Sequence, residues 1–175
     1  MSKEIEIEKT YLAKFLPSGF KKFKSKKIID IYLPQNSKHA KLRIRKSGDS
    51  YTVTKKNVLD KKTASIQLEE SILITVEEFK ELARLKSNII KKTRYYYPYK
   101  SKIAEIDVFE GRLKGLVLID FEFKNKKESN NFKIPNFCLA DVTEEENIAG
   151  GVLCRHSLTS LKKVLNSFSY RKIIL

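Results

Sequence analysis

The sequence has no long hydrophobic run and no leader-like start. No apolar run approaches the ~20 residues that a membrane-spanning helix needs. The first residues, MSKEIEIEKTYL, have no apolar segment of the kind found in signal peptides. We therefore expect a cytoplasmic protein that has no membrane partner.

Cysteine is scarce, and the motifs of several enzyme classes are missing. Cys138 and Cys154 lie far apart without CxxC spacing, so a zinc site is poorly supported and free thiols in a reducing cytoplasm are expected. The chain contains no GxxxxGK[ST] loop and no plausible Ser/His/Asp set. These absences argue against a P-loop enzyme and a serine hydrolase.

Positive charge, in contrast, is abundant. The chain has 175 residues, of which 41% are hydrophobic and 33% charged, which suits a single domain spanning 1–175 with a sizeable core. Its formal net charge is +15. A basic excess of this size indicates a polyanionic partner, either nucleic acid or a phosphate-rich small molecule, unless it reflects a Lys-rich proteome. The placement of the charges must separate these alternatives.

Hydrophobic alternation and turn residues predict a chain made mainly of strands. Two helices are expected over 75–86, with a Thr75/Glu78 capping box, and over 156–168, with an apolar stripe at helical spacing. Strands in a largely meandering order predict a mainly β (α+β) fold, an antiparallel barrel that closes or nearly closes, with a few flanking helices. The expected strands span Glu4–Ala13, Ile28–Leu33, Lys41–Lys46, Tyr51–Lys56, Ser65–Ile74, Asn88–Tyr97, Lys102–Glu110 and Gly115–Phe123.

The charged residues of these strands are segregated by sign. Because alternate residues of a strand face opposite sides, EIEIEKTYL puts its glutamates on one face. Other strands carry only cations on one face, whereas an exposed sheet usually interleaves opposite charges. We infer a lumen with a basic wall and an acidic wall. Its inward candidates are Arg43, Arg45, Lys56, Lys92 and Arg94 on one side and Glu6, Glu8, Glu105, Asp107, Asp120 and Glu122 on the other.

Such a lumen needs partners for its charges. Arginine forks match phosphate oxygens, and carboxylates together with phosphates are the ligands that Mg²⁺ prefers. A divalent cation held between carboxylates and a polyphosphate would neutralise both. The pattern therefore predicts a phosphoryl-transfer site.

The order of these motifs resembles a known family. Glu6-Ile7-Glu8-Lys9-Thr10 occupies the register of an ExExK strand, LRIRKSGDSYTVTKK at 42–56 looks like an RxR hairpin with a following lysine, and KTR at 92–94 and EIDVFEGRLKGLVLIDFEF at 105–123 look like later KxR and acidic strands. The sequence thus resembles the CYTH superfamily, the triphosphate tunnel metalloenzymes. The resemblance implies an eight-stranded antiparallel barrel that forms a tunnel.

The resemblance also implies roles for individual residues. Arg43, Arg45, Lys56, Lys92 and Arg94 would bind a triphosphate, and Glu6, Glu8, Asp120 and Glu122 would bind Mg²⁺ or Mn²⁺. Glu6, Glu8, Arg43, Lys56 and Arg94 would carry the catalytic functions. Glu69, Glu105 and Asp107 are additional tunnel acids, and Glu4 is expected at the tunnel mouth.

One position departs from the pattern. The lysine of ExExK is expected at position 10, on the face of Glu6 and Glu8, but this chain has Thr10 there. Lys9 is one residue early and is expected to point away from that face. A threonine hydroxyl can hydrogen-bond water or phosphate but supplies no charge.

The expected activity is metal-dependent hydrolysis of inorganic triphosphate, thiamine triphosphate or a nucleoside triphosphate by a monomer or homodimer. One alternative is a class IV-type adenylyl cyclase on the same fold. Another is a non-catalytic polyphosphate- or RNA-binding module, which FKKFKSKK at 20–27 would favour, although a solvated Lys-rich loop is the preferred interpretation of that stretch. His39, just before the RxR strand, could contact phosphate, but a loop-edge residue is the preferred interpretation.

Overall fold

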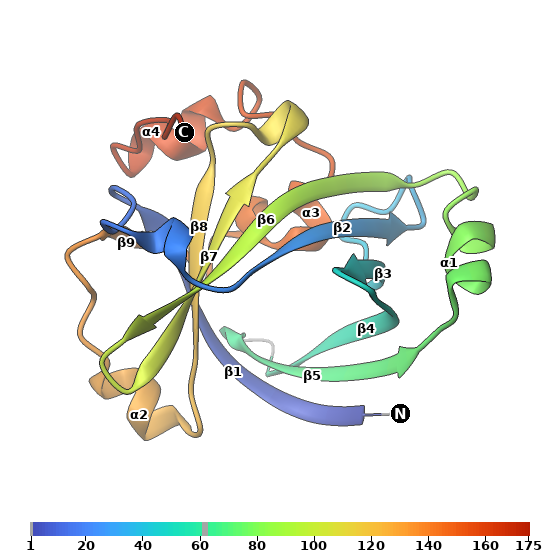
Figure 1. The fold of residues 1–175 in the computed structure, drawn as a ribbon, viewed down its shortest axis with the longest axis horizontal. Coiled ribbons are helices and arrows are strands. Elements are labelled where there is room, and N and C mark those ends of the chain that lie inside the picture. The colour runs from blue at the N-terminus through green and yellow to red at the C-terminus, as the bar shows by residue number, and fades with distance from the viewer. Residues whose placement is uncertain (1, 61–62) are drawn as a thin grey trace.

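The computed structural model describes residues 2–60 and 63–175, and its main feature is one antiparallel sheet of nine strands (Figure 1). The strand order is β5-β4-β3-β2-β6-β7-β8-β1-β9, and β1 also pairs with β5. Eight strands therefore close into a barrel, and β9 extends the sheet beyond β1. The predicted eight-stranded antiparallel barrel is confirmed.

All eight predicted strands are present, with bounds that differ by a few residues. The strands are β1 Ser2–Ala13, β2 Ser25–Leu33, β3 Leu42–Ser47, β4 Ser50–Asp60, β5 Thr63–Leu73, β6 Asn88–Tyr99, β7 Lys102–Phe109, β8 Val117–Glu122 and β9 Cys138–Asp141. The helices are α1 Val76–Leu82, α2 Lys126–Asn131, α3 Gly150–Leu153 and α4 Lys162–Ser167, with short 3-10 turns at Phe20–Lys22, Gly111–Leu113 and Glu146–Ile148.

Closure of the barrel depends on β1. Its first half, from Ser2 to Ile7, pairs with β5, and its second half, from Glu8 to Leu12, pairs with β8. One continuous strand thus joins the two edges of the meander. Because the alternation of β1 continues through the change of partner, the side chains of Glu6, Glu8 and Thr10 all face the interior.

Apolar segments cover the outside of the barrel. On one side, α1 packs over β2 and β3 with Ile31, Leu33 and Ile44 beneath it (Figure 1). On the opposite side, the outer faces of β1, β7 and β8 form a second core with Phe20 and Phe137. Covered outer faces are the reason that β8 is buried along nearly its whole length.

The C-terminal region closes one end of the barrel interior. Leu12, Ile90 and Leu118 project from the barrel into an apolar cluster with Leu153 and Leu161. Residues 142–153 are called the closed end below. They are tied to the chain before β3 by a hydrogen bond of 3.1 Å, which the Ala40 N–H donates to the Gly151 carbonyl. The interior is therefore polar along part of its length and apolar at this end.

The second predicted helix is wrong over its first half. Only Lys162–Ser167 is helical, because Ser157 and Ser160 form a local turn in which each backbone N–H donates to the other hydroxyl, at 2.9 and 3.2 Å. Such side-chain bonds compete with helix formation.

The capping box at Thr75 and Glu78 is confirmed. Within the described chain, no helix combines the length and apolar character needed to cross a membrane.

Candidate active site

A cavity of about 300 Å³ runs through the polar part of the barrel interior. Every one of the eight barrel strands contributes to its lining. Of the residues singled out in the sequence, the lining contains Glu6, Glu8, Thr10, Arg43, Arg45, Lys56, Glu69, Lys92, Arg94, Asp107, Asp120 and Glu122. Glu105 does not line the cavity but forms an ion pair with Arg94.

Buried carboxylates hold part of the basic wall in place. Arg45 Nε and Nη2 donate to the two oxygens of Asp30 at 2.6 and 2.8 Å, a bidentate pair. Although burial opposes ionisation, the Arg45 guanidinium holds the pKa of Asp30 well below its usual range. Arg45 is thereby fixed as a cation that lines the cavity.

A second group of carboxylates fixes β6. Arg94 bonds both oxygens of Asp107, each at 2.6 Å, and also reaches Asp120 at 3.0 Å. Lys92 donates to the same Asp107, and the two cations bring the pKa of that carboxyl to about 2 against the effect of burial. Burial lowers the pKa of Lys92 itself.

Arg43 differs from these cations because it has no close partner. Its contacts with Asp30 and Glu69 are long, at 3.9 and 3.7 Å. Its Nε is buried and, within the described residues, makes no hydrogen bond. A buried guanidinium N–H without a partner is costly, so this group is available to an anion in the cavity.

Lys56 lies between two acids of the opposite wall. Its Nζ is 2.5 Å from a Glu6 oxygen and 2.8 Å from a Glu69 oxygen. Lys56 and Ser71, a hydrogen-bond donor at 3.0 Å, bring the pKa of Glu69 to about 2 despite burial. Burial raises the pKa of Glu6 in spite of the same lysine.

The acidic wall brings carboxylates of β1 and β8 close together. Glu8 faces Glu122 across the β1–β8 pair, and Thr10 faces Asp120. Burial raises the pKa of Glu8 and Glu122, and burial together with Glu8 raises the pKa of Asp120 to about 7. Like charges opposite each other are unfavourable, so this wall would be stabilised by a cation.

Thr10 is placed as the sequence register predicted. Its hydroxyl is 2.8 Å from Asp120 Oδ1 and 3.3 Å from Glu8 Oε1, so it bridges two carboxylates. Lys9 points to the other side, where its Nζ lies 3.7 Å from Asp141. The β1–β8 register is regular through these positions, and no bulge turns Lys9 inward.

The residues of the acidic wall suit a hard divalent cation. Carboxylate oxygens from neighbouring strands are the donors that Mg²⁺ and Mn²⁺ take, and burial raises the pKa of Glu8, Asp120 and Glu122. In the described residues, no three acids, histidines or cysteines are already grouped closely enough to enclose an ion. Such a cation would therefore complete its shell with water and phosphate oxygens.

Some lining residues were not identified from the sequence. Asp30 is the acid of an otherwise apolar stretch, IIDIYL, and its inward parity was the only signal for it. Gln67 and Thr143 also line the cavity, and so does His39, which was interpreted as a loop-edge residue. Thr143 and the closed end come from a segment without a clear periodic pattern. Glu4 was expected at the tunnel mouth, but its side chain is not among those that the structure describes.

Comparison with known proteins identifies the family. The model of the CYTH domain matches residues 3–135. The chain belongs to the CYTH domain family. A curated relative from Nitrosomonas europaea, an inorganic triphosphatase, is 28% identical over 143 residues, covering 81% of this chain and 91% of the relative. A solved structure of an inorganic triphosphatase superposes with a TM-score of 0.64 at 26% identity, over 86% of this chain and 95% of the other.

Proposed function

We propose that this protein is a metal-dependent hydrolase of small molecules that contain a triphosphate, with Mg²⁺ or Mn²⁺ as its cofactor. The observation that carries the proposal is the pairing of two walls in one cavity. One wall holds Arg43, a buried cation without a close partner, and the other holds Glu8, Asp120 and Glu122, acids short of positive charge. A triphosphate bound with a divalent cation satisfies both walls.

Each wall has a distinct part in the proposed reaction. Arg43, Arg45, Lys56, Lys92 and Arg94 bind the phosphate oxygens and hold the chain in line for attack by water. Their fixed carboxylate partners preorganise Arg45 and Arg94, so these side chains need not reorder during the reaction. Glu6, Glu8, Asp120 and Glu122 would provide oxygen ligands for the divalent cation. When bound there, the cation would supply neutralisation of phosphate charge and activation of water.

The curated relative supports inorganic triphosphate as the first substrate to test, since it is an inorganic triphosphatase. Phosphate release should be measured with inorganic triphosphate, pyrophosphate, thiamine triphosphate and ATP, each with Mg²⁺ and with Mn²⁺. A separate assay for cyclic AMP tests the adenylyl cyclase alternative. The proposal is wrong if triphosphates neither bind nor react with either metal.

A matched pair of variants ties any activity to the cavity. Glu6→Gln removes a carboxylate that lines it, and Glu77→Gln removes an exposed carboxylate on α1. We expect a loss of about 100-fold or more in kcat/KM for Glu6→Gln, the size typical of a lost group in a preorganised site. Glu77→Gln should retain the rate of the unaltered protein. RNA binding without any hydrolysis would instead favour the non-catalytic alternative.

A further inference from the structure

The cavity does not account for the positive charge of the protein. Among the described residues that line it, seven carboxylates outnumber six lysines and arginines. The formal excess of +15 is therefore carried outside the cavity. The location of this outer excess can therefore point to a second anionic partner.

The excess is concentrated in one part of the sequence. Residues 9–29 contain seven lysines and no acid. Four of these lysines fall in the stretch from Lys21 to Lys26, which leads from the 3-10 turn at Phe20–Lys22 into β2. Phe20 is buried against Tyr95, so only part of this stretch is free to meet a partner.

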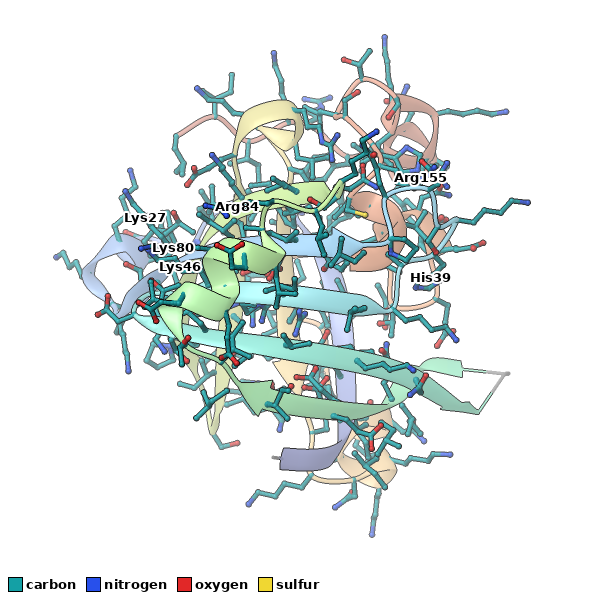
Figure 2. The ribbon with its side chains drawn as sticks, turned by 90° about the vertical axis from the view of Figure 1, so that its right-hand side faces the viewer. Lys27, His39, Lys46, Lys80, Arg84 and Arg155 are labelled. Carbon is teal, nitrogen blue, oxygen red and sulfur yellow. The ribbon has the colours of Figure 1, made fainter. Side chains whose placement is uncertain are left out.

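The structure brings the end of this stretch against the β3–β4 hairpin. Together they form an open surface groove of about 1030 Å³, here called the basic groove. It is lined by Lys24, Lys26, Lys27 and Lys46, with Asp49 as the one acid among the described lining residues and Tyr51 beside Lys46. Figure 2 shows Lys27 and Lys46, which both line the groove, on the same side of the molecule.

The side chains of these lysines take no part in the ion pairs found among the described residues. In the described parts of the chain, none of Lys24, Lys27 and Lys46 lies within 4 Å of a carboxylate oxygen, whereas cavity cations such as Lys56 do. The Nζ atom of Lys46 lies over an aromatic ring, 5.5 Å from the centre of the Tyr51 ring. Unpaired lysines that share one groove repel each other, and a polyanion would relieve that repulsion.

Aromatic rings flank the lysines. Phe23, directly before Lys24, is 40% exposed and has its edge contact with Tyr97. Tyr51, in the groove, packs against Phe79 with ring centroids 5.0 Å apart and is partly exposed. Lysines that neutralise a phosphate backbone, next to aromatic rings on which bases can stack, are the combination used to bind single strands.

We propose that the basic groove is a binding site for single-stranded nucleic acid, separate from the cavity inside the barrel. The lysines contact phosphates without reading sequence, and Phe23 and Tyr51 stack on bases. The proposal is independent of the proposed hydrolase activity, because no lysine of the groove lines the cavity.

The test compares two triple variants with the same change of charge. Lys24→Gln/Lys27→Gln/Lys46→Gln neutralises the groove, and Lys124→Gln/Lys126→Gln/Lys127→Gln neutralises three exposed lysines near α2. The probe is a fluorescein-labelled 20-nucleotide oligouridylate, followed by anisotropy in EDTA over a range of salt concentrations. We expect at least about a tenfold loss of affinity for the groove variant and less than about threefold for the α2 variant.

The salt dependence gives a second readout. For single strands, log K falls with log salt by about 0.7 per phosphate contact, so the groove variant should lose about 2 from this slope. Phe23→Leu should weaken binding about fivefold or more without changing the slope, because it removes only stacking. Equal losses in both triple variants, or anisotropy that does not change with RNA at 0.1 M salt, would overturn the proposal. Binding to anionic lipid vesicles but not to RNA would also overturn it.

Discussion

Asp120 is a buried acid of the cavity that lies beside a second carboxylate, Glu8. Its pKa is raised from 3.8 to about 7 by burial and then by Glu8. Between about pH 4 and pH 7 the folded protein therefore holds a proton that the unfolded chain has released. Without metal, this contribution to the free energy of unfolding falls as the pH rises through that window.

A bound divalent cation should reverse the trend, because it favours the ionised carboxylate. We expect the increase in Tm caused by Mn²⁺ to grow from pH 5.5 to pH 8, as measured by thermal melts in EDTA and in excess MnCl₂. Asp120→Asn should flatten the dependence on pH. An equal Mn²⁺ shift across the range would contradict this assignment.

Thr10 offers a second test at the residue scale. Its hydroxyl lies between Asp120 and Glu8, so the ammonium of Thr10→Lys would lie close to both carboxylates. An added cation should lower the pKa of Asp120 and move the acidic limb of the kcat/KM profile down by about one pH unit, which corresponds to about 1.4 kcal/mol. Thr10→Val adds no charge and removes a hydrogen-bond donor to Asp120, so it should not move the limb down. A limb that does not move in Thr10→Lys would exclude Asp120 as its origin.

At the scale of elements, the closed end depends on two glycines. A Cβ on Gly150 would lie 2.3 Å from the Tyr32 hydroxyl oxygen, and a Cβ on Gly151 would lie 2.1 Å from the Ala40 carbonyl oxygen. Overpacking of this kind costs about 1–3 kcal/mol. Both alanine variants should therefore melt about 3–10 °C lower in thermal denaturation.

The two clashes should respond differently to a second substitution. Tyr32→Phe removes the atom that meets residue 150, so Gly150→Ala/Tyr32→Phe should recover most of the lost stability. Gly151→Ala/Tyr32→Phe should not recover, because its clash is with backbone. If Gly150→Ala/Tyr32→Phe does not recover, the contact with the Tyr32 hydroxyl is not what Gly150→Ala disturbs.

The elements that could be predicted from the sequence are those with a strong two-residue period. β1 alternates without interruption, which fixed the inward positions of Glu6, Glu8 and Thr10 and the outward position of Lys9. β9 was not predicted, because this short segment owes its extended form to pairing with β1. Asp30 was not identified either, since one acid in an apolar strand gives no sign of its partner until β3 is folded beside it.

At the scale of the whole molecule, the cavity and the surface have opposite charge. With seven carboxylates and six lysines and arginines in its described lining, the cavity by itself does not attract a triphosphate, although the protein carries +15. The sequence assigned six acids and five cations to the lumen and so indicated this balance, but it did not identify Asp30, the buried acid that pairs with Arg45. Inorganic triphosphate should therefore bind at least about tenfold more weakly in EDTA than with Mn²⁺, as measured by calorimetry.

Neutralising part of the acidic wall separates binding from hydrolysis. Glu8→Gln/Glu122→Gln changes the lining from one negative charge in excess to one positive charge in excess. Two unit charges within about 8 Å of a phosphate are worth about 2 kcal/mol each near a protein surface, so metal-free binding of triphosphate should tighten by about tenfold or more. The same variant should lose hydrolysis by about 100-fold or more, because it loses two ligands for the cation.

Glu77→Gln/Glu81→Gln, which makes the same change of charge on exposed α1, should alter neither property. If it tightens binding as much as the cavity variant does, net charge rather than the acidic wall governs the affinity.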